Sequence, residues 1–136
     1  MKKDIHYNQD ILFNNILEMG YTFFTGVPDS LLKVFINNIK KCDNIVATNE
    51  SQAIGLAVGA ELAGKKSCVY MQNSGIGNII NPLTSLCIPF DISPLIVIGH
   101  RHTLPQHKIM GEIDDKIMDI IGYKNYIIVY GNNNVK

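Results

Sequence analysis

The most constraining feature of this sequence is an unbroken apolar run, Leu95-Ile96-Val97-Ile98, which stands between Pro94 and Gly99. Successive side chains of a strand point to opposite faces of its sheet, so a continuous apolar run predicts a strand that is buried on both faces. Such a strand needs a covering layer on each side, and helices normally supply it. The run therefore favours a parallel sheet inside an α/β domain.

Helical and strand-like patterns alternate along the rest of the chain. Strands are expected over 21–25, 45–48, 67–72, 94–99 and 125–130, and helices over 10–19, 30–40, 51–63, from the turn at 73–78 to about 87, and 111–121. This order predicts βαβ units, and hence a doubly wound, mostly parallel sheet with helices on both faces. Because no linker rich in Pro, Gly or Ser divides it, the chain is expected to form a single domain, 1–136.

Charge, hydropathy and cysteine count exclude several classes of protein. The 12 basic and 12 acidic residues cancel, so no excess of cations is available to displace counterions from a nucleic acid. No apolar run reaches the length of about 18 residues that a membrane span needs. The three cysteines form no CxxC pair and no HExxH motif occurs, so we expect neither a disulfide framework nor a metal site in this chain. These features favour a cytoplasmic protein.

Ligands of parallel α/β sheets bind beyond the carboxyl ends of the strands. In the first such loop, 26–30, Asp29 either caps the next helix or acts as an acid or base. The loop at 73–78 contains an incomplete dinucleotide fingerprint, which indicates a turn that approaches a ligand closely. The loop at 100–107 holds three of the four histidines and the only arginine, Arg101. It is either a solvated loop or an anion-binding loop with a group that titrates near neutral pH.

The remaining loop, 49–52, places Glu50 at the start of a helix of small and apolar residues, 53–60. This composition predicts a helix that is buried on every side, with Gly55 and Gly59 allowing close approach of another helix, from this chain or from a second subunit. A carboxylate at the mouth of such a helix would favour its protonated form and be suited to proton exchange. The helix dipole alone would also explain a glutamate there.

Several motif-like segments follow one another along these loops. They are Gly26-Val27-Pro28-Asp29-Ser30-Leu31-Leu32-Lys33, Asn49-Glu50-Ser51-Gln52-Ala53-Ile54-Gly55-Leu56-Ala57, Tyr70-Met71-Gln72-Asn73-Ser74-Gly75-Ile76-Gly77-Asn78, Asn81-Pro82-Leu83, and Pro105-Gln106-His107 with Gly111 after it. Together they resemble the pyrimidine-binding domain of the thiamine-diphosphate-dependent phosphonopyruvate and sulfopyruvate decarboxylases. The first two segments are more similar to the phosphonopyruvate branch.

The resemblance implies a role for each matching residue. Glu50 would hydrogen-bond a ring nitrogen of the cofactor's aminopyrimidine and so assist removal of the proton from its reactive carbon. Asp29 and His107 match residues that transfer protons. The implied cofactor-binding residues are Glu50, Asn73, Gly75 and Gly77, and the implied substrate-binding residues are Ser30, Asn73, Arg101 and Gln106, with Arg101 facing a phosphonate or sulfonate.

The implied function is that of an α subunit that converts 3-phosphonopyruvate to phosphonoacetaldehyde and CO₂, with sulfopyruvate as the alternative substrate. The chain departs from the family in its shorter loop at 100–107 and in lacking a Gly-Asp-Gly…Asn motif. In the family that motif holds Mg²⁺ and the diphosphate, so a partner β subunit with a diphosphate-binding domain, and an oligomer, are expected. A non-catalytic binding or scaffold domain that retains the fold remains the alternative from another class.

Overall fold

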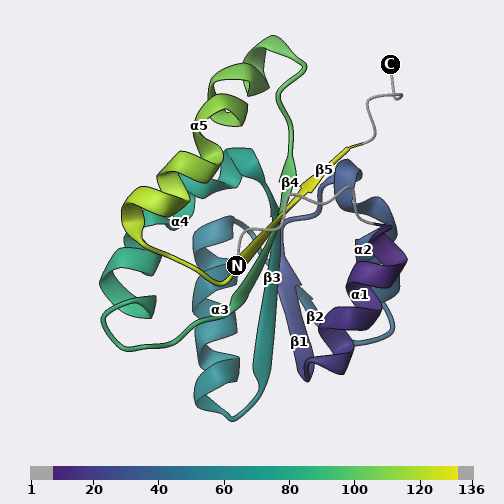
Figure 1. The fold of residues 1–136 in the computed structure, drawn as a ribbon. Helices are drawn as coiled ribbons and strands as arrows, with labels where there is room; N and C mark the ends of the chain where they lie inside the picture. Colours follow the sequence, from purple (N-terminus) through teal and green to yellow (C-terminus); the bar gives the residue numbers. More distant parts are fainter. Residues whose placement is uncertain (1–7, 132–136) are drawn as a thin grey trace.

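The structure, a computed structural model, describes residues 8–131. Its centre is a five-stranded sheet in which the strands lie in the order β2-β1-β3-β4-β5 and every pairing is parallel (Figure 1). The predicted α/β fold with a doubly wound sheet is therefore confirmed. The strands are β1 (Tyr21–Gly26), β2 (Asp43–Val46), β3 (Lys66–Gln72), β4 (Leu95–His100) and β5 (Tyr126–Tyr130).

Helices cover both faces of this sheet, α1 and α2 on one side and α3, α4 and α5 on the other (Figure 1). The central strands are buried on both faces, as the apolar run predicts: Val97 packs in the core under α1 and α2, whereas Ile96 and Ile98 pack in the core under α3 and α4. The helices are α1 (Gln9–Glu18), α2 (Lys33–Ile39) after a 3-10 turn (Ser30–Leu32), α3 (Glu50–Leu62), α4 (Ile76–Pro82) continued by a π-helical turn (Leu83–Cys87), and α5 (Pro105–Ile121).

Two predicted elements are misplaced. Strand β2 spans Asp43–Val46 and not 45–48, and α5 begins at Pro105 and not at Gly111. Proline is well suited to the first turn of a helix because its fixed φ is helical and its missing N–H has no intrahelical partner there. Gly111 lies inside α5, where a Cβ would come within 2.3 Å of the Cβ of His102. The second half of the predicted 100–107 loop is consequently the first turn of α5.

The expectation that α3 is buried on every side is also wrong for this chain. Ala53 and Ala57 are buried against the sheet and α4, but Gly55 and Gly59 are exposed, and a Cβ built on either glycine meets nothing within 4 Å. Near its end, Leu62 is 75% exposed. A helix lying on one face of an open sheet contacts the sheet and its neighbouring helix only, so its outer side stays open whatever its composition.

The chain order reverses between β1 and β3, which are neighbours in the sheet. The connection after β1 runs outward to the edge strand β2, whereas the connections after β3 run the other way, to β4 and β5. Such a switch point, at the carboxyl ends of the strands, is where ligands bind in open α/β sheets. The loops that contain Asp29 and Asn73 follow these two strands. No helix within residues 8–131 combines the length and apolarity needed to cross a bilayer.

Candidate functional site

An ion pair joins the loops that follow β1 and β4. The Nε of Arg101 donates to Oδ1 of Asp29 at 2.9 Å, and its Nη2 donates to Oγ of Ser30 at 2.5 Å. The Asp29 side chain is only 5% exposed, and its Oδ2 also accepts from the backbone N–H of Leu31 at 3.2 Å. Asp29 therefore acts as the predicted cap, and its buried charge is balanced by Arg101.

The Asp29 carboxylate lies over a glycine. A Cβ on Gly99, near the end of β4, would be 2.7 Å from Oδ2 of Asp29 and 3.2 Å from Cγ of Leu32. The lack of a side chain at this position is what lets the β1 loop lie against β4. This contact brings Arg101 next to Asp29 and Ser30, which stand 72 and 71 residues before it in the sequence. The loop after β1 thus reaches across β3 to β4, which is not a neighbour of β1 in the sheet.

A second carboxylate, Glu50, opens α3 and also lies over a glycine. A Cβ on Gly75 would be 2.4 Å from Cγ and 2.6 Å from Oε1 of Glu50. Asn78 donates from Nδ2 to Oε2 of Glu50 at 2.8 Å, and no residue among 8–131 hydrogen-bonds Oε1. The side chain of Asn49 caps the helix by accepting from the N–H of Gln52 at 2.9 Å. Glu50 is thus a half-buried carboxylate at a helix N-terminus with one oxygen able to accept a hydrogen bond.

Asn73 lies beneath these loops and is fully buried. Its Nδ2 donates to the backbone oxygen of Arg101 at 2.9 Å and to Oδ2 of Asp114 at 3.0 Å. Both partners are acceptors, so the orientation of the amide is determined by its contacts. The buried Oδ1 receives no hydrogen bond from the described residues. A buried acceptor without a donor is costly, so this oxygen stands out among the buried polar atoms of the described residues.

The other predicted site residues lie nearer the surface. His107, in the first turn of α5, places its Nδ1 3.4 Å from Nε2 of Gln72, which donates to Oγ of Ser74 at 2.8 Å. Gln106 and Gly77 are exposed, and a Cβ on Gly77 would meet nothing within 4 Å. In the described part of the chain, no hydrogen bond joins Gln106 to Asp29 or to Glu50.

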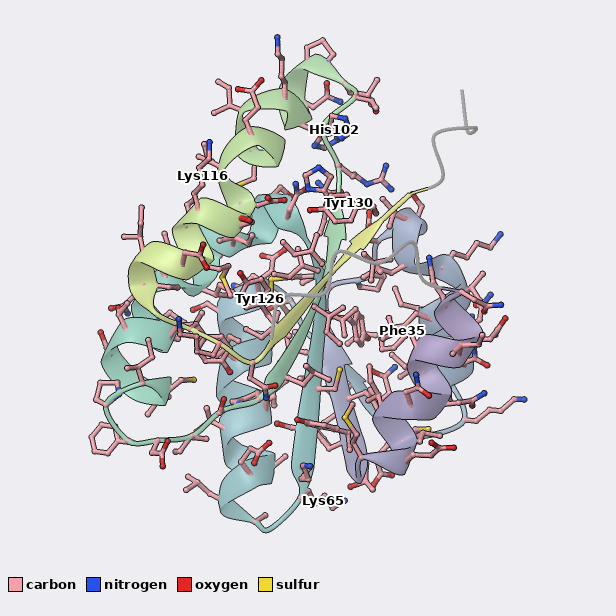
Figure 2. All side chains as sticks on the ribbon, viewed as in Figure 1. Phe35, Lys65, His102, Lys116, Tyr126 and Tyr130 are labelled. Atoms are coloured by element: carbon pink, nitrogen blue, oxygen red, sulfur yellow. The ribbon has the colours of Figure 1, made fainter. Side chains whose placement is uncertain are left out.

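Sequence reasoning missed two groups at the same end of the sheet, the buried Asp114 and the partly buried His100. Asp114 on α5 is 3% exposed, and its Oδ2 accepts from Nδ1 of His100 at 2.6 Å. The ring of His100 packs against those of Tyr130 and His102, with centroids 4.5 Å and 5.0 Å away. Figure 2 shows His102 and Tyr130 at this end of the sheet and Lys65 at the opposite end.

A signal for Asp114 was nevertheless present in the sequence. It stands at helical spacing from Met110, Ile117 and Met118, on the otherwise apolar face of the helix. A charged residue on such a face is buried with a partner, since an unpaired charge would be too costly there. In residues 8–131 no group of three or more His, Cys, Asp or Glu side chains is arranged to hold a metal ion.

Comparison with curated proteins finds clear relatives, although no protein-family model matches the chain. The chain is 38% identical over 122 residues to the sulfopyruvate decarboxylase subunit alpha of Methanocaldococcus jannaschii, an alignment that covers 85% of this chain and 72% of that protein. It is 39% identical to the same subunit of Methanococcus maripaludis, over 76% of this chain and 64% of the relative. It is 36% identical to the phosphonopyruvate decarboxylase of Streptomyces viridochromogenes, over 75% of this chain but only 28% of the relative.

Solved structures show the same fold at low sequence identity. One is a 2-oxoglutarate:ferredoxin oxidoreductase from Magnetococcus marinus, with a TM-score of 0.58 and 14% identity over 90% of this chain and 28% of that one. Another is a putative thiamin diphosphate-dependent enzyme from Mycobacterium smegmatis, with a TM-score of 0.56 and 14% identity over 90% of this chain and 30% of that one. The chain thus spans under a third of each.

Proposed function

The chain belongs to the family of sulfopyruvate decarboxylase α subunits and phosphonopyruvate decarboxylases, and from this premise we propose that it is the pyrimidine-binding α subunit of a thiamine-diphosphate-dependent decarboxylase. The proposed reaction converts 3-phosphonopyruvate to phosphonoacetaldehyde and CO₂. Sulfopyruvate is the second candidate substrate, because three relatives are named as α subunits of sulfopyruvate decarboxylase and align over 72%, 64% and 60% of their length.

The observation that carries this proposal is the environment of Glu50. Its Oε2 is held by Asn78 and its carbon chain lies on Gly75, which leaves Oε1 to accept a hydrogen bond from a protonated ring nitrogen. The buried Oδ1 of Asn73 also needs a donor, so the residues fit an aminopyrimidine. When bound, thiamine diphosphate supplies a nucleophilic carbon and an electron sink for decarboxylation. Gly75 and Gly77 would form the backbone side of that site.

Residues of the neighbouring loops are proposed to hold the substrate. Arg101 donates hydrogen bonds from its Nε to Asp29 and from its Nη2 to Ser30, and its other N–H groups can bind the anionic phosphonate or sulfonate. Asp29 is proposed to move a proton at the reacting carbon, and His107, on the first turn of α5, to serve as a second proton carrier. Ser30, Asn73 and Gln106 would complete the substrate contacts.

Replacement of Arg101 tests whether its guanidinium binds the anionic group of the substrate. The change Arg101→Ala is expected to raise KM for the anionic 2-oxo acid about 10- to 100-fold, since a hydrogen bond to a charged group contributes about 1.5–3 kcal/mol. Steady-state kinetics of the assembled enzyme measure it, and Lys116→Ala, which removes an exposed cation from α5, is the control. An unchanged KM would exclude Arg101 as the anion-binding group.

A partner subunit is part of the proposal, because relatives of this chain are named as α subunits. That partner would supply the diphosphate-binding domain and its Mg²⁺. The exposed side of α3, with Gly55, Gly59 and Leu62, is the proposed contact surface, since small residues allow two helices to approach closely.

The surface on α3 can be tested without disturbing the fold. A leucine at position 55 has room in the isolated chain, because a Cβ there meets nothing within 4 Å. Gly55→Leu is therefore expected to leave thermal unfolding of the free chain within about 1 kcal/mol of wild type. It should abolish the complex in light scattering. A complex of normal mass would rule this surface out.

The deciding experiment is coexpression with a candidate partner subunit, identified as a chain that carries a Gly-Asp-Gly…Asn motif. CO₂ release is then measured from phosphonopyruvate and from sulfopyruvate, with thiamine diphosphate and Mg²⁺. Turnover of one acid establishes the activity and names the substrate. A stable complex that turns over neither acid would favour another 2-oxo acid, or the non-catalytic binding domain.

A further inference from the structure

Asp114, a buried carboxylate that the proposed reaction does not use, joins three elements at the carboxyl end of the sheet. Its Oδ2 accepts from Nδ1 of His100, at the end of β4, and from Nδ2 of Asn73, after β3. Its Oδ1 accepts from the backbone N–H of Asp115 at 2.7 Å. Both oxygens of this α5 side chain therefore face hydrogen-bond donors.

A carboxylate satisfies this arrangement, and an amide of the same size does not. If an asparagine at position 114 kept its oxygen toward His100 and Asn73, its NH₂ group would face the N–H of Asp115. If it turned over, the NH₂ group would face two donors instead. Either orientation leaves buried donors opposed, which costs more than the loss of a single hydrogen bond.

The contacts of Asp114 continue into the candidate site. The second hydrogen on Nδ2 of Asn73 goes to the backbone oxygen of Arg101, and the Arg101 guanidinium holds Asp29 and Ser30. We infer that Asp114 is a positioning residue: it sets the tautomer of His100 and, through Asn73, the pose of Arg101 against the β1 loop. The effect of Asp114 on turnover rests on the proposed function, whereas its hydrogen bonds to His100 and Asn73 are a property of this chain alone.

Asp114 selects one tautomer of His100. When Nδ1–H donates to Asp114, the Nε2 atom of the neutral ring carries no hydrogen and is left as an acceptor. The side chain is 9% exposed and its ring contacts those of Tyr130 and His102, so it is held in one orientation. Nitrogen NMR of the full chain, at a pH where the ring is neutral, should therefore show a protonated Nδ1. A neutral ring protonated at Nε2 would overturn this assignment.

The Arg101 part can be followed on a single resonance, because this chain contains no other arginine. The Nε–H of Arg101 is expected to exchange slowly with water in the wild type, since Asp29 holds it at a site that is largely buried. In Asp114→Asn its exchange should accelerate at least about tenfold. Glu112→Gln makes the same charge change at an exposed position on α5 and should leave the rate unchanged. An unchanged rate in Asp114→Asn would contradict the inference.

A second variant protects the test against a failure of Asp114→Asn to fold. Asn73→Ala keeps the carboxylate and the His100 contact but removes the link to the Arg101 carbonyl. It should accelerate exchange of the Arg101 Nε–H in the same way while leaving the protonation of His100 at Nδ1. Normal protection of Arg101 in a folded Asn73→Ala chain would overturn the proposed connection.

Kinetics of the assembled enzyme separate positioning from general structural damage. Asp114→Asn is expected to lower kcat/KM about 10- to 100-fold, the scale of a small misplacement of reacting groups. In an Arg101→Ala background the same change should cost less than about threefold, because residues that act as one unit are non-additive. Full additivity would refute the inference. If the wild-type complex turns over neither acid while the Arg101 resonance responds as expected, the proposed function fails and the positioning role of Asp114 stands.

Discussion

Replacement of Glu50 by glutamine is expected to lower kcat of the assembled decarboxylase about 10²- to 10⁴-fold, the range for loss of a positioned acid or base. Glutamine has the same size and can still accept a hydrogen bond from Asn78. Its NH₂ group, however, would replace the one carboxylate oxygen that no residue among 8–131 hydrogen-bonds. That position then donates where it must accept, so the chemistry is lost while the local fold is kept.

The control for Glu50→Gln is Glu112→Gln, which removes an exposed carboxylate from α5. Steady-state kinetics with phosphonopyruvate and sulfopyruvate give the readout, and thermal unfolding of each free variant checks the fold. A Glu50→Gln enzyme within about threefold of wild type, with the control equally active, would remove the observation on which the proposed function depends.

Substitution of Gly26 by alanine is expected to destabilise the chain by about 3 kcal/mol, at the upper end of the usual cost of overpacking. A Cβ at this position would lie 2.0 Å from the backbone oxygen of Tyr70 and 2.6 Å from its ring. Gly26 and Tyr70 are paired residues of β1 and β3, and Val27 donates its N–H to the same Tyr70 oxygen at 3.1 Å. The two strands must therefore separate at the switch point to accommodate one methyl group.

Gly55→Ala is the matched change in the opposite direction. Position 55 is an exposed interior position of α3 with nothing within 4 Å of a Cβ, and alanine is favoured over glycine in a helix by about 0.5–1 kcal/mol. Urea unfolding of the isolated chain should thus place the midpoint of Gly26→Ala well below wild type and that of Gly55→Ala slightly above it. A Gly26→Ala midpoint at or above that of wild type would contradict the first interpretation, and a Gly55→Ala midpoint below wild type would contradict the second.

The fold could be predicted because its signals are local. A strand that is buried on both faces needs a continuous apolar run, and β4 has one; a helix on one face needs apolar residues at helical spacing, and α1 has them. Parallel strands also bring their carboxyl ends to one edge of the sheet, so the loops that contain Asp29, Glu50 and Arg101 are predicted to lie there. The resemblance of those loops to one decarboxylase family agrees with the relatives found by comparison.

Only the tertiary structure decided which distant residues meet, because those contacts depend on the order of the strands in the sheet and on the length of the side chains. The Asp29–Arg101 pair requires that β1 and β4 lie on either side of β3, and the buried contacts of Asp114 require that α5 cross the ends of β3 and β4. Periodicity along one segment carries no information about which distant residues it will meet. For the same reason composition suggested an entirely buried α3, although the sheet and α4 cover only one side of it and leave Gly55 and Gly59 open.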